Sequence, residues 1–465
     1  DSLYVAERKA RERLQGMEND FPCASWLPVI FQNPTATPPT WEKLPNPSGG
    51  KQPRNFWRRV GALFGASVVV TGAVMGVRAL GWLQPLELPA YDQMMRWRSS
   101  DEGQDKRLLL ITIDDADIAY QQEQGWKRRW SLSDEALNRL LQFLEQHKAR
   151  AIGLDIVRDA KVDPELPDLA KRLKKSDSFY VVCAVHTPGD RKSGTKPPPE
   201  VPVGRQGFSN VVQDIDGVVR RHLLSMDKFP TSPCTTAYAL SSMLAFSYLH
   251  KQGIEPSYTQ EGNLQLGKVI FKRLQAPSGG YQKLDTRGNQ VLLNYRSYDS
   301  PFEITDTVTL TQVLTGGVKP EFVENRIILI GAITSTVIDH FPTPYTKGQR
   351  YYQEMPGVIL HAQMVSHILS SVLDNRPLLS VLPFWEDSLW VLTWSLVGGI
   401  VALFYSAKTR LAFTGIVAIV ILGGICYALF NQGYWLPFFP SCLALILTGG
   451  IMLIYSHRFT TDYYR

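Results

Sequence analysis

The chain has 465 residues, of which 44% are hydrophobic and 20% are charged, a balance that is typical of folded protein and excludes a disordered chain. Its formal net charge is +6, but the sequence has no basic stripe interleaved with aromatic residues. We therefore exclude a nucleic-acid-binding function, while the length allows two or three folded units.

The first part of the chain contains no long apolar run. Residues 1–20 predict the end of a charged helix, SWLPVIF at 25–31 predicts a short strand, and residues 37–59 have the proline, glycine and serine content of a linker. The chain begins with Asp1 and no signal peptide precedes it, so we expect a piece of a longer or processed protein.

Four later segments are apolar and long enough to cross a bilayer as helices. A hydrocarbon core of about 30 Å is crossed by roughly 20 helical residues. A single segment must cross it as a helix, because only a helix satisfies all of its own backbone hydrogen bonds in lipid. We place the four transmembrane helices at 60–83, 388–407, 411–430 and 436–456.

The basic residues beside these segments predict the orientation, because short loops rich in lysine and arginine stay in the cytoplasm. They precede the first segment, separate the second from the third and follow the fourth: Lys51, Arg54, Arg58, Arg59, Lys408, Arg410, His457 and Arg458. We expect both termini, including the tail 457–465, to be cytoplasmic, and residues 84–386 to lie outside the plasma membrane.

Two cysteines, Cys183 and Cys234, fall in the region that we expect outside, where thiols are oxidised. A disulfide between them and two buried free thiols are the alternatives that the sequence leaves open.

The outer region alternates buried-strand and helical patterns. Continuous apolar runs at 108–113, 151–157 and 179–185 are separated by amphipathic helical patterns, a further apolar run lies at 326–332, and a final helix begins near Val358. Such strands indicate parallel pairing with right-handed crossovers. The predicted fold class is α/β, with three layers around a mixed, mainly parallel sheet, plus four transmembrane α-helices.

Several polar residues follow these strands. Ligands bind outside the carboxyl ends of parallel strands, so Asp114, Asp115, Asp155 and the end of the strand at Gly331 predict one carboxylate-lined pocket. Capping of the following helices is the alternative role of the aspartates.

Three more residues are candidates for binding a ligand. Asp339 lies in a long loop, which in compact domains is often functional. His361 lies one turn inside the last helix, where ordinary burial is the alternative. Arg296 either pairs with one of the carboxylates or ends a surface strand.

The stretch GFSNVVQDIDGVVRRHLL, residues 207–224, lacks the further acidic residues of a calcium loop. Asp216-Gly217 instead predicts a hairpin between two strands, with one of Arg220 and Arg221 facing the domain and the other facing water. We expect Arg220, before either aspartate, to contact a ligand. No protease, P-loop, dinucleotide or hydrolase motif is present, so we expect no cofactor, no metal and no enzymatic activity.

The motifs LLLITIDDADI, RAIGLDIV, GFSNVVQDIDGVVRRHLL, NYR, IILIGA and MPGVILHAQMVSHIL occur in this order. Together they resemble the second type of CHASE domain, the extracytoplasmic sensor of cyclases and histidine kinases, over residues 84–380. The resemblance implies signal reception at a bacterial plasma membrane, with one span before the sensor and three after it. FPCASWLPVIFQNP resembles the final strand of a caspase-like CHAT domain, whose remnant would be residues 1–36; no catalytic residue is carried over.

We accordingly expect a multi-pass receptor that contacts membrane lipid, forms a homodimer, binds a small-molecule or peptide ligand and signals to a cytoplasmic caspase-like module or output partner. One alternative is an anchored outer hydrolase or transferase that uses Asp114, Asp155, Asp339 and His361. Another is a structural membrane subunit that has no ligand.

Overall fold

The computed structural model describes residues 3–20, 53–98, 102–186, 194–229, 231–298, 300–334, 339–350, 353–404 and 408–461. The chain divides into two compact units, Asp1–Gly65 and Ala66–Arg465. Helix α1 (Leu3–Gln15) belongs to the first unit and is charged, as predicted. The predicted strand at 25–31, Cys23 and most of the linker lie outside the described residues.

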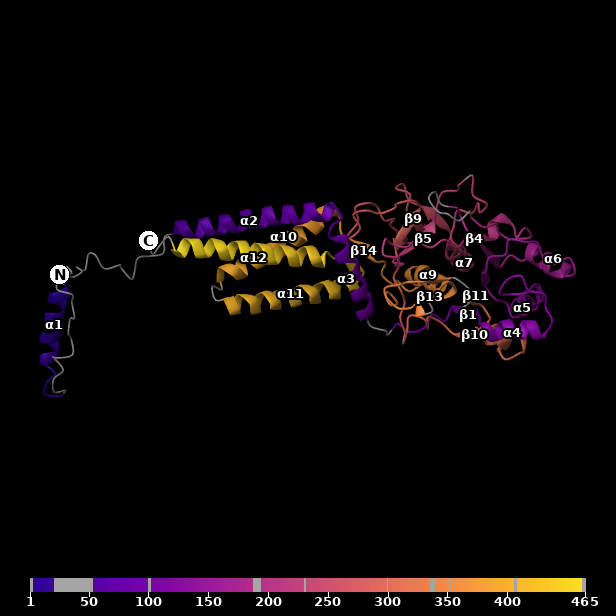
Figure 1. Ribbon diagram of the computed structural model, residues 1–465, viewed down its shortest axis with the longest axis horizontal. Helices are drawn as coiled ribbons and strands as arrows, with labels where there is room; N and C mark the ends of the chain where they lie inside the picture. The colour runs from indigo at the N-terminus through magenta and orange to yellow at the C-terminus, as the bar shows by residue number, and fades with distance from the viewer. Residues whose placement is uncertain are drawn as a thin grey trace. The chain divides into compact units, whose positions relative to one another are not determined.

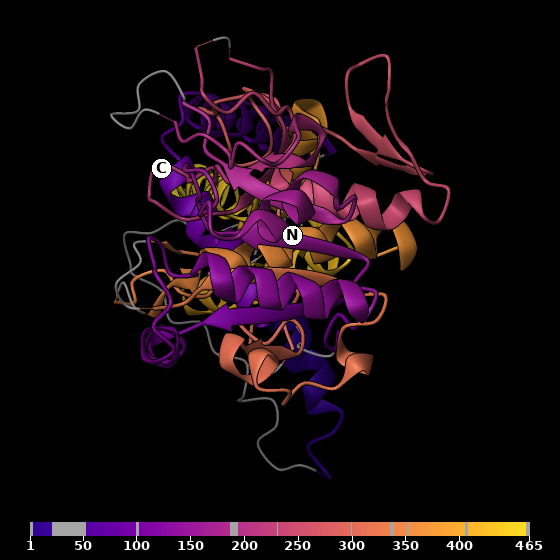
Figure 2. The ribbon, with the colours of Figure 1, turned by 90° about the vertical axis from the view of Figure 1, so that its right-hand side faces the viewer.

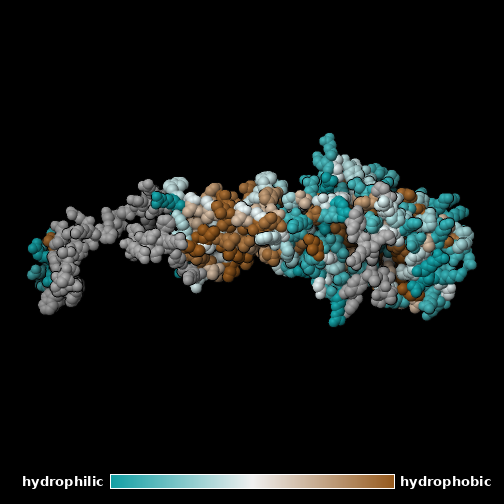
Figure 3. Space-filling model, turned by 45° about the horizontal axis from the view of Figure 1, so that its top comes forward, coloured by the Kyte–Doolittle hydropathy of each residue, from teal (hydrophilic) through white to brown (hydrophobic). Residues whose placement is uncertain are grey.

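Four helices within the described ranges are long and apolar enough to cross a membrane, as predicted. They are α2 (Pro53–Ala79), α10 (Phe384–Phe404), α11 (Lys408–Asn431) and α12 (Phe438–Thr461). Figure 3 shows hydrophobic side chains gathered in a band over these helices, whereas the surface of the α/β domain is mostly hydrophilic. The chain is therefore a membrane protein.

The membrane helices pack closely. Gly398 of α10 lies against the Leu445 backbone of α12, so a Cβ at that position would collide with it. The hydroxyl groups of Ser395 and Thr448 join the same two helices at 2.6 Å, which satisfies both polar groups away from water.

The α/β domain is built on a six-stranded parallel sheet with the order β10-β1-β11-β2-β3-β4. The strands are β1 (Leu108–Ile113), β2 (Ala151–Asp155), β3 (Phe179–Cys183), β4 (Gln206–Phe208), β10 (Thr307–Thr309) and β11 (Ile327–Ala332). The central strand β11 is buried along its whole length, which explains its continuous apolar sequence.

Helices cover both faces of this sheet (Figures 1 and 2). One core joins the sheet to α5 (Asp134–Gln146), α6 (Pro167–Lys175) and α8 (Leu310–Leu314), and α4 (Asp115–Glu123) lies beside it. The other core joins it to α7 (Leu240–His250) and α9 (Gly357–Leu373). The predicted three-layer α/β class is confirmed.

Smaller sheets complete the domain. They comprise the antiparallel pair β5 (Arg221–Ser225) and β9 (Asn289–Leu292), the three strands β6 (Pro256–Tyr258), β7 (Leu264–Leu266) and β8 (Val269–Phe271), and the pair β12 (His340–Phe341) and β13 (Met355–Pro356). Two short 3-10 helices are Val203–Arg205 and Pro320–Phe322.

The predicted hairpin at Asp216-Gly217 is wrong. Strand β4 joins the main sheet beside β3, while β5 pairs with β9, so the strands on either side of the turn do not pair with each other. The turn itself is tight: the Gly217 amide donates to the Asp214 carbonyl at 2.8 Å, and Gly217 has a φ of 79°. Arg220 and Arg221 are both buried, so the prediction that one faces water is also wrong.

Helix α3 (Gln84–Trp97) lies between the membrane helices and the α/β domain (Figure 1). Its Tyr91 ring packs edge-on against Phe430 and Trp435, with centroid distances of 5.4 and 4.9 Å. Trp435 belongs to β15 (Tyr434–Trp435), in the loop between α11 and α12, which pairs with β14 (Ser380–Val381) just before α10. Helices α10, α11 and α12 thus share one packed core with α3.

Cys183, at the end of β3, forms a disulfide with Cys234, and their Cα atoms are 5.5 Å apart. Of the two alternatives left by the sequence, the disulfide is the one found. It ties the edge of the main sheet to the segment before α7.

Candidate functional site

Three of the predicted site residues come together at the carboxyl edge of the main sheet. Asp155 ends β2, Asp339 precedes β12 and His361 lies in α9. His361 Nε2 is 3.7 Å from Asp155 Oδ1. We call these three residues the edge cluster.

Two glycines position the edge cluster. Gly331 of β11 lies directly against Val358, and a Cβ there would collide with the valine side chain, so glycine lets α9 approach the sheet. The Gly357 amide donates to the Asp339 carbonyl at 2.9 Å, and a Cβ at Gly357 would strike the Asp339 carboxylate. The first turn of α9 therefore holds both Asp339 and His361 beside the strand ends.

Burial controls the protonation of the edge cluster. It raises the pKa of Asp155 to about 7. Burial, together with the charge of Asp155, raises the pKa of Asp339 to about 6. Burial lowers the pKa of His361 to about 4. Near neutral pH the cluster therefore exchanges protons on its carboxyl groups while the imidazole stays neutral.

Two members of the edge cluster are buried, and Asp339 is half-buried. The side chains of Asp155 and His361 are 6% and 4% exposed. Asp155 Oδ2 and His361 Nδ1 accept or donate no hydrogen bond within the described part of the chain. Over those same residues no group of three or more histidine, cysteine, aspartate or glutamate side chains is arranged to hold a metal ion. The cluster can take up protons, but the burial of Asp155 and His361 leaves only Asp339 partly exposed to a larger ligand.

The other predicted residues lie elsewhere. Asp114 caps α4: its carboxylate accepts from the Asp117 amide at 2.9 Å, and Asp117 accepts from the Asp114 amide at 3.0 Å. Asp115 is exposed in the first turn of that helix. Of the two roles that the sequence allowed, the capping of a helix is therefore the one found for Asp114.

Arg296 is buried away from the edge cluster. Its Nε donates to Ser366 Oγ at 3.1 Å, and Ser366 in turn donates to Asp105 Oδ2 at 2.7 Å. Its Nη1 donates to the carbonyls of Glu102 and Gly103. These bonds hold the segment before β1 against α9.

Arg220 is the centre of a buried ion network that reaches α3. Its guanidinium donates to Asp92 at 2.6 and 2.7 Å, to Asp214 at 2.7 Å and to Asp216 at 2.8 and 2.9 Å. Burial alone would raise the pKa of Asp216, but hydrogen bonds from Arg220 and Lys347 outweigh burial and hold that pKa well below its ordinary value.

Arg221 and Tyr281 complete this network around Asp214. Arg221 pairs with Asp214 Oδ1 at 2.8 Å, and the Tyr281 hydroxyl donates to Asp214 Oδ2 at 2.7 Å. The network explains why two consecutive arginines can both be buried.

A second buried network joins α3 to two membrane helices. Arg78, at the end of α2, donates to Glu87 of α3 at 2.9 Å and to Asp387 of α10 at 2.6 Å. All three side chains are at most 2% exposed. The sequence alone did not predict this network, although Arg78 is a charge within the first apolar segment and Asp387 directly precedes the second.

Helix α3 is therefore bound on two sides. Glu87 fixes it to the membrane helices and Asp92 fixes it to the α/β domain. These residues are five positions apart, about 1.4 helical turns, so they leave the helix in different directions. A displacement of the α/β domain at Arg220 must therefore act on α3.

The family model described as the CHASE2 domain matches residues 69–400, more than half of the chain. The match begins inside α2 and ends inside α10, so it includes α3 and both ion networks. No curated protein and no solved structure gives a match.

Proposed function

This chain belongs to the CHASE2 domain family, and from that premise we propose that it is a multi-pass receptor of the bacterial plasma membrane. Its α/β domain lies outside the membrane and senses a small-molecule or peptide signal. The basic residues beside the membrane helices support this orientation, because Lys408 and Arg410 lie in the first turn of α11, directly after the short connection from α10.

The observation that carries the proposal is the double attachment of α3. A receptor needs a ligand that binds two domain states with different affinity, and a rigid element that responds to the difference. Glu87 and Asp92 make α3 such an element, because one is paired with the membrane helices and the other with the α/β domain.

We place the output on the cytoplasmic side. The resemblance of residues 1–36 to the end of a caspase-like CHAT domain supports a cytoplasmic module or partner protein as the recipient. A homodimer would bring two copies of that module together. The receptor itself performs no chemistry in this proposal.

The test uses the full chain in lipid nanodiscs and a panel of amino acids, dipeptides, monosaccharides, nucleotides and inorganic ions. A compound that stabilises the protein is expected to change hydrogen exchange in the α/β domain, in 84–97 and at the start of α10. In Asp92→Asn the compound should still change exchange in the domain, while the response at the start of α10 is lost. If no compound stabilises the protein, or the response reaches α10 equally in Asp92→Asn, the proposal fails.

A hydrolase or transferase is a second candidate, because three of its four expected residues do meet in the edge cluster. A buried carboxyl group with a pKa near 7 beside a neutral imidazole is suited to acid–base catalysis. Turnover by the full chain that disappears in Asp155→Asn but persists in Asp159→Asn, where an exposed aspartate loses the same charge, would favour this candidate over the receptor.

A further inference from the structure

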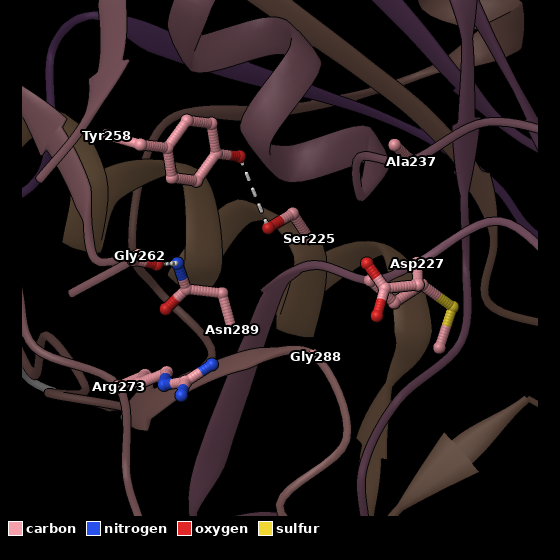
Figure 4. Close-up of a pocket in the computed structure, with 9 residues that line it drawn as sticks. Ser225, Asp227, Ala237, Tyr258, Gly262, Arg273, Gly288 and Asn289 are labelled. Carbon is pink, nitrogen blue, oxygen red and sulfur yellow. Dashed lines mark hydrogen bonds between the residues drawn. The ribbon is translucent and has the colours of Figure 1, made fainter. Parts of the chain in front are cut away.

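A second site lies at the far end of the β5–β9 pair from the Arg220 network. A cleft of about 240 Å³ opens between this pair and the three-stranded β6–β8 sheet. Figure 4 shows Ser225, Tyr258, Arg273 and Asn289 grouped around the cleft, with Asp227 on the other side of Gly288 in this view.

The buried wall of the cleft carries an acceptor that has no partner. Asn289 is 5% exposed, and its Oδ1 accepts no hydrogen bond from the described residues. Its Nδ2 makes only a long contact of 3.5 Å with the Gly262 carbonyl (Figure 4). A buried amide oxygen without a donor has lost its hydrogen bond to water, so a ligand with an N–H or O–H group would recover this loss.

The open part of the cleft carries one charge of each sign. The guanidinium of Arg273 and the carboxylate of Asp227 line it, and neither makes a side-chain hydrogen bond or ion pair within the described ranges. Both residues are exposed, so their charges are available to a ligand. A plain anion would be repelled by Asp227 and a plain cation by Arg273, whereas a molecule with both charges would pair with each.

A glycine shapes the floor of the cleft. Gly288 has a φ of 74°, and a Cβ there would lie 2.6 Å from the Ser225 carbonyl and 2.7 Å from a Leu223 methyl group. The chain therefore turns sharply into β9 and leaves the space above it open. Ser225 and Tyr258, whose hydroxyls are 3.5 Å apart, supply further hydrogen-bonding groups.

We propose that this cleft binds a small zwitterion, a free α-amino acid, whose carboxylate pairs with Arg273, whose ammonium group pairs with Asp227 and whose side chain donates a hydrogen bond to Asn289 Oδ1. The volume supports a ligand of this size, because pockets for drug-sized molecules are larger, about 300–1,000 Å³. This inference rests on the proposed receptor function and names its ligand class.

The position of the cleft connects it to α3. Strand β5 carries Ser225 at the cleft, and Arg220, which binds Asp92 of α3, lies directly before the other end of the same strand. Asn289 at the cleft is paired with Ser225 across the β5–β9 ladder. A ligand that draws Asn289 and Asp227 together therefore acts on the strand that leads to Arg220.

The test measures binding of each of the common amino acids to the full chain in nanodiscs by calorimetry and thermal shift. At least one amino acid should bind, and its amide, which lacks the carboxylate, and its N-acetyl derivative, which lacks the ammonium group, should each bind at least about tenfold more weakly. Asp227→Asn and Arg273→Gln should weaken binding to a similar extent. Asp159→Asn is the matched control and should bind normally.

These variants change exposed side chains, so loss of folding does not confuse the result. The inference is overturned if no amino acid binds, if the amide or N-acetyl derivative binds as well as the parent, or if Asp227→Asn and Arg273→Gln bind normally. If another compound of the panel elicits the α10 response instead, the receptor function stands and the ligand assignment fails. If an amino acid binds but exchange at α10 does not change, the cleft stands and the signalling role fails.

Discussion

Asp92 of α3 and Arg220 form a bidentate ion pair, with both carboxylate oxygens accepting at 2.6 and 2.7 Å and both side chains at most 1% exposed. This pair connects α3 to the residue directly before β5 of the α/β domain, across 128 positions of the sequence. Its energetic value can be measured separately from its proposed role in signalling.

Asp92→Asn should lower the free energy of unfolding by about 3 kcal/mol, the lower end of the cost of breaking a buried ion pair, because Arg220 keeps Asp214 and Asp216. The measurement is denaturant or thermal unfolding of the full chain in nanodiscs. Asp159→Asn, which removes an exposed carboxylate, should change stability by less than about 0.5 kcal/mol. Equal effects of the two substitutions would show that the pair contributes nothing specific.

Arg78 offers a sharper comparison, because it neutralises two carboxylates at once. Arg78→Met leaves Glu87 and Asp387 buried without their cation and should destabilise the protein by about 3–5 kcal/mol. The triple variant Arg78→Met, Glu87→Gln, Asp387→Asn should recover most of that loss, because it buries no charge. Thermal unfolding of both variants measures this difference. A triple variant no more stable than Arg78→Met would show that the unpaired charges of Glu87 and Asp387 are not the cause of the loss.

The layers of the fold follow from local sequence. LLLITI and IILIGA are apolar on both faces and therefore predict central parallel strands. The membrane helices follow from uncharged length, and the edge cluster follows from the rule that parallel strands end at one edge.

The contacts that join the parts do not follow from local sequence. Arg78 and Asp387 are 309 positions apart, and no periodicity indicates that they meet. The hairpin prediction failed for the same reason: Asp-Gly correctly indicates a turn, but β5 pairs with β9, whose first residue, Asn289, lies far along the chain. The buried Asn289 acceptor was likewise invisible, because nothing near it in sequence shows which donor it lacks.

The disulfide can be tested directly. Cys183→Ala with Cys234→Ala should lower the free energy of unfolding by about 2–4 kcal/mol, since the bond closes a loop between residues 51 positions apart. Unfolding with and without a reducing agent measures the effect. The reductant should destabilise the parent protein and leave the double variant unchanged; an effect of similar size on both would mean that the reductant does not act through the bond between Cys183 and Cys234.

The proposed orientation of the membrane helices predicts a labelling pattern. In a background without Cys23, Cys426 and Cys442, a membrane-impermeant maleimide applied to intact cells should label Lys127→Cys and miss Thr409→Cys. Both positions are exposed to solvent, and after the membrane is permeabilised both should react. The reverse pattern on intact cells would place the α/β domain in the cytoplasm and remove the receptor proposal.

The edge cluster predicts a stability difference that depends on pH. The pKa of Asp155 is about 7 in the folded chain and 3.8 ordinarily, so the stability that its protonated form contributes is full below about pH 4 and is lost as pH rises through about 7. An asparagine at this position cannot ionise, so the variant does not lose this stability as pH rises. Asp155→Asn should therefore gain more stability over the parent protein at about pH 8 than at about pH 5, with the gain growing as pH rises from about 4 to about 7.

Neighbouring groups shape this profile but do not reverse its sign. Asp339, with a pKa near 6, adds a change of the same direction. His361, whose pKa burial lowers to about 4, contributes in the opposite direction, because its neutral form stabilises the fold above the ordinary pKa of 6.5 and that contribution is lost as pH falls through about 4. Asp155→Asn also removes the charge that helps to raise the pKa of Asp339, so the difference between the two proteins reports Asp155 together with its effect on Asp339, and both changes have the same sign. Thermal unfolding at several pH values gives that difference directly, and a constant difference from about pH 5 to about pH 8 would mean that Asp155 is ionised throughout, as an exposed aspartate would be.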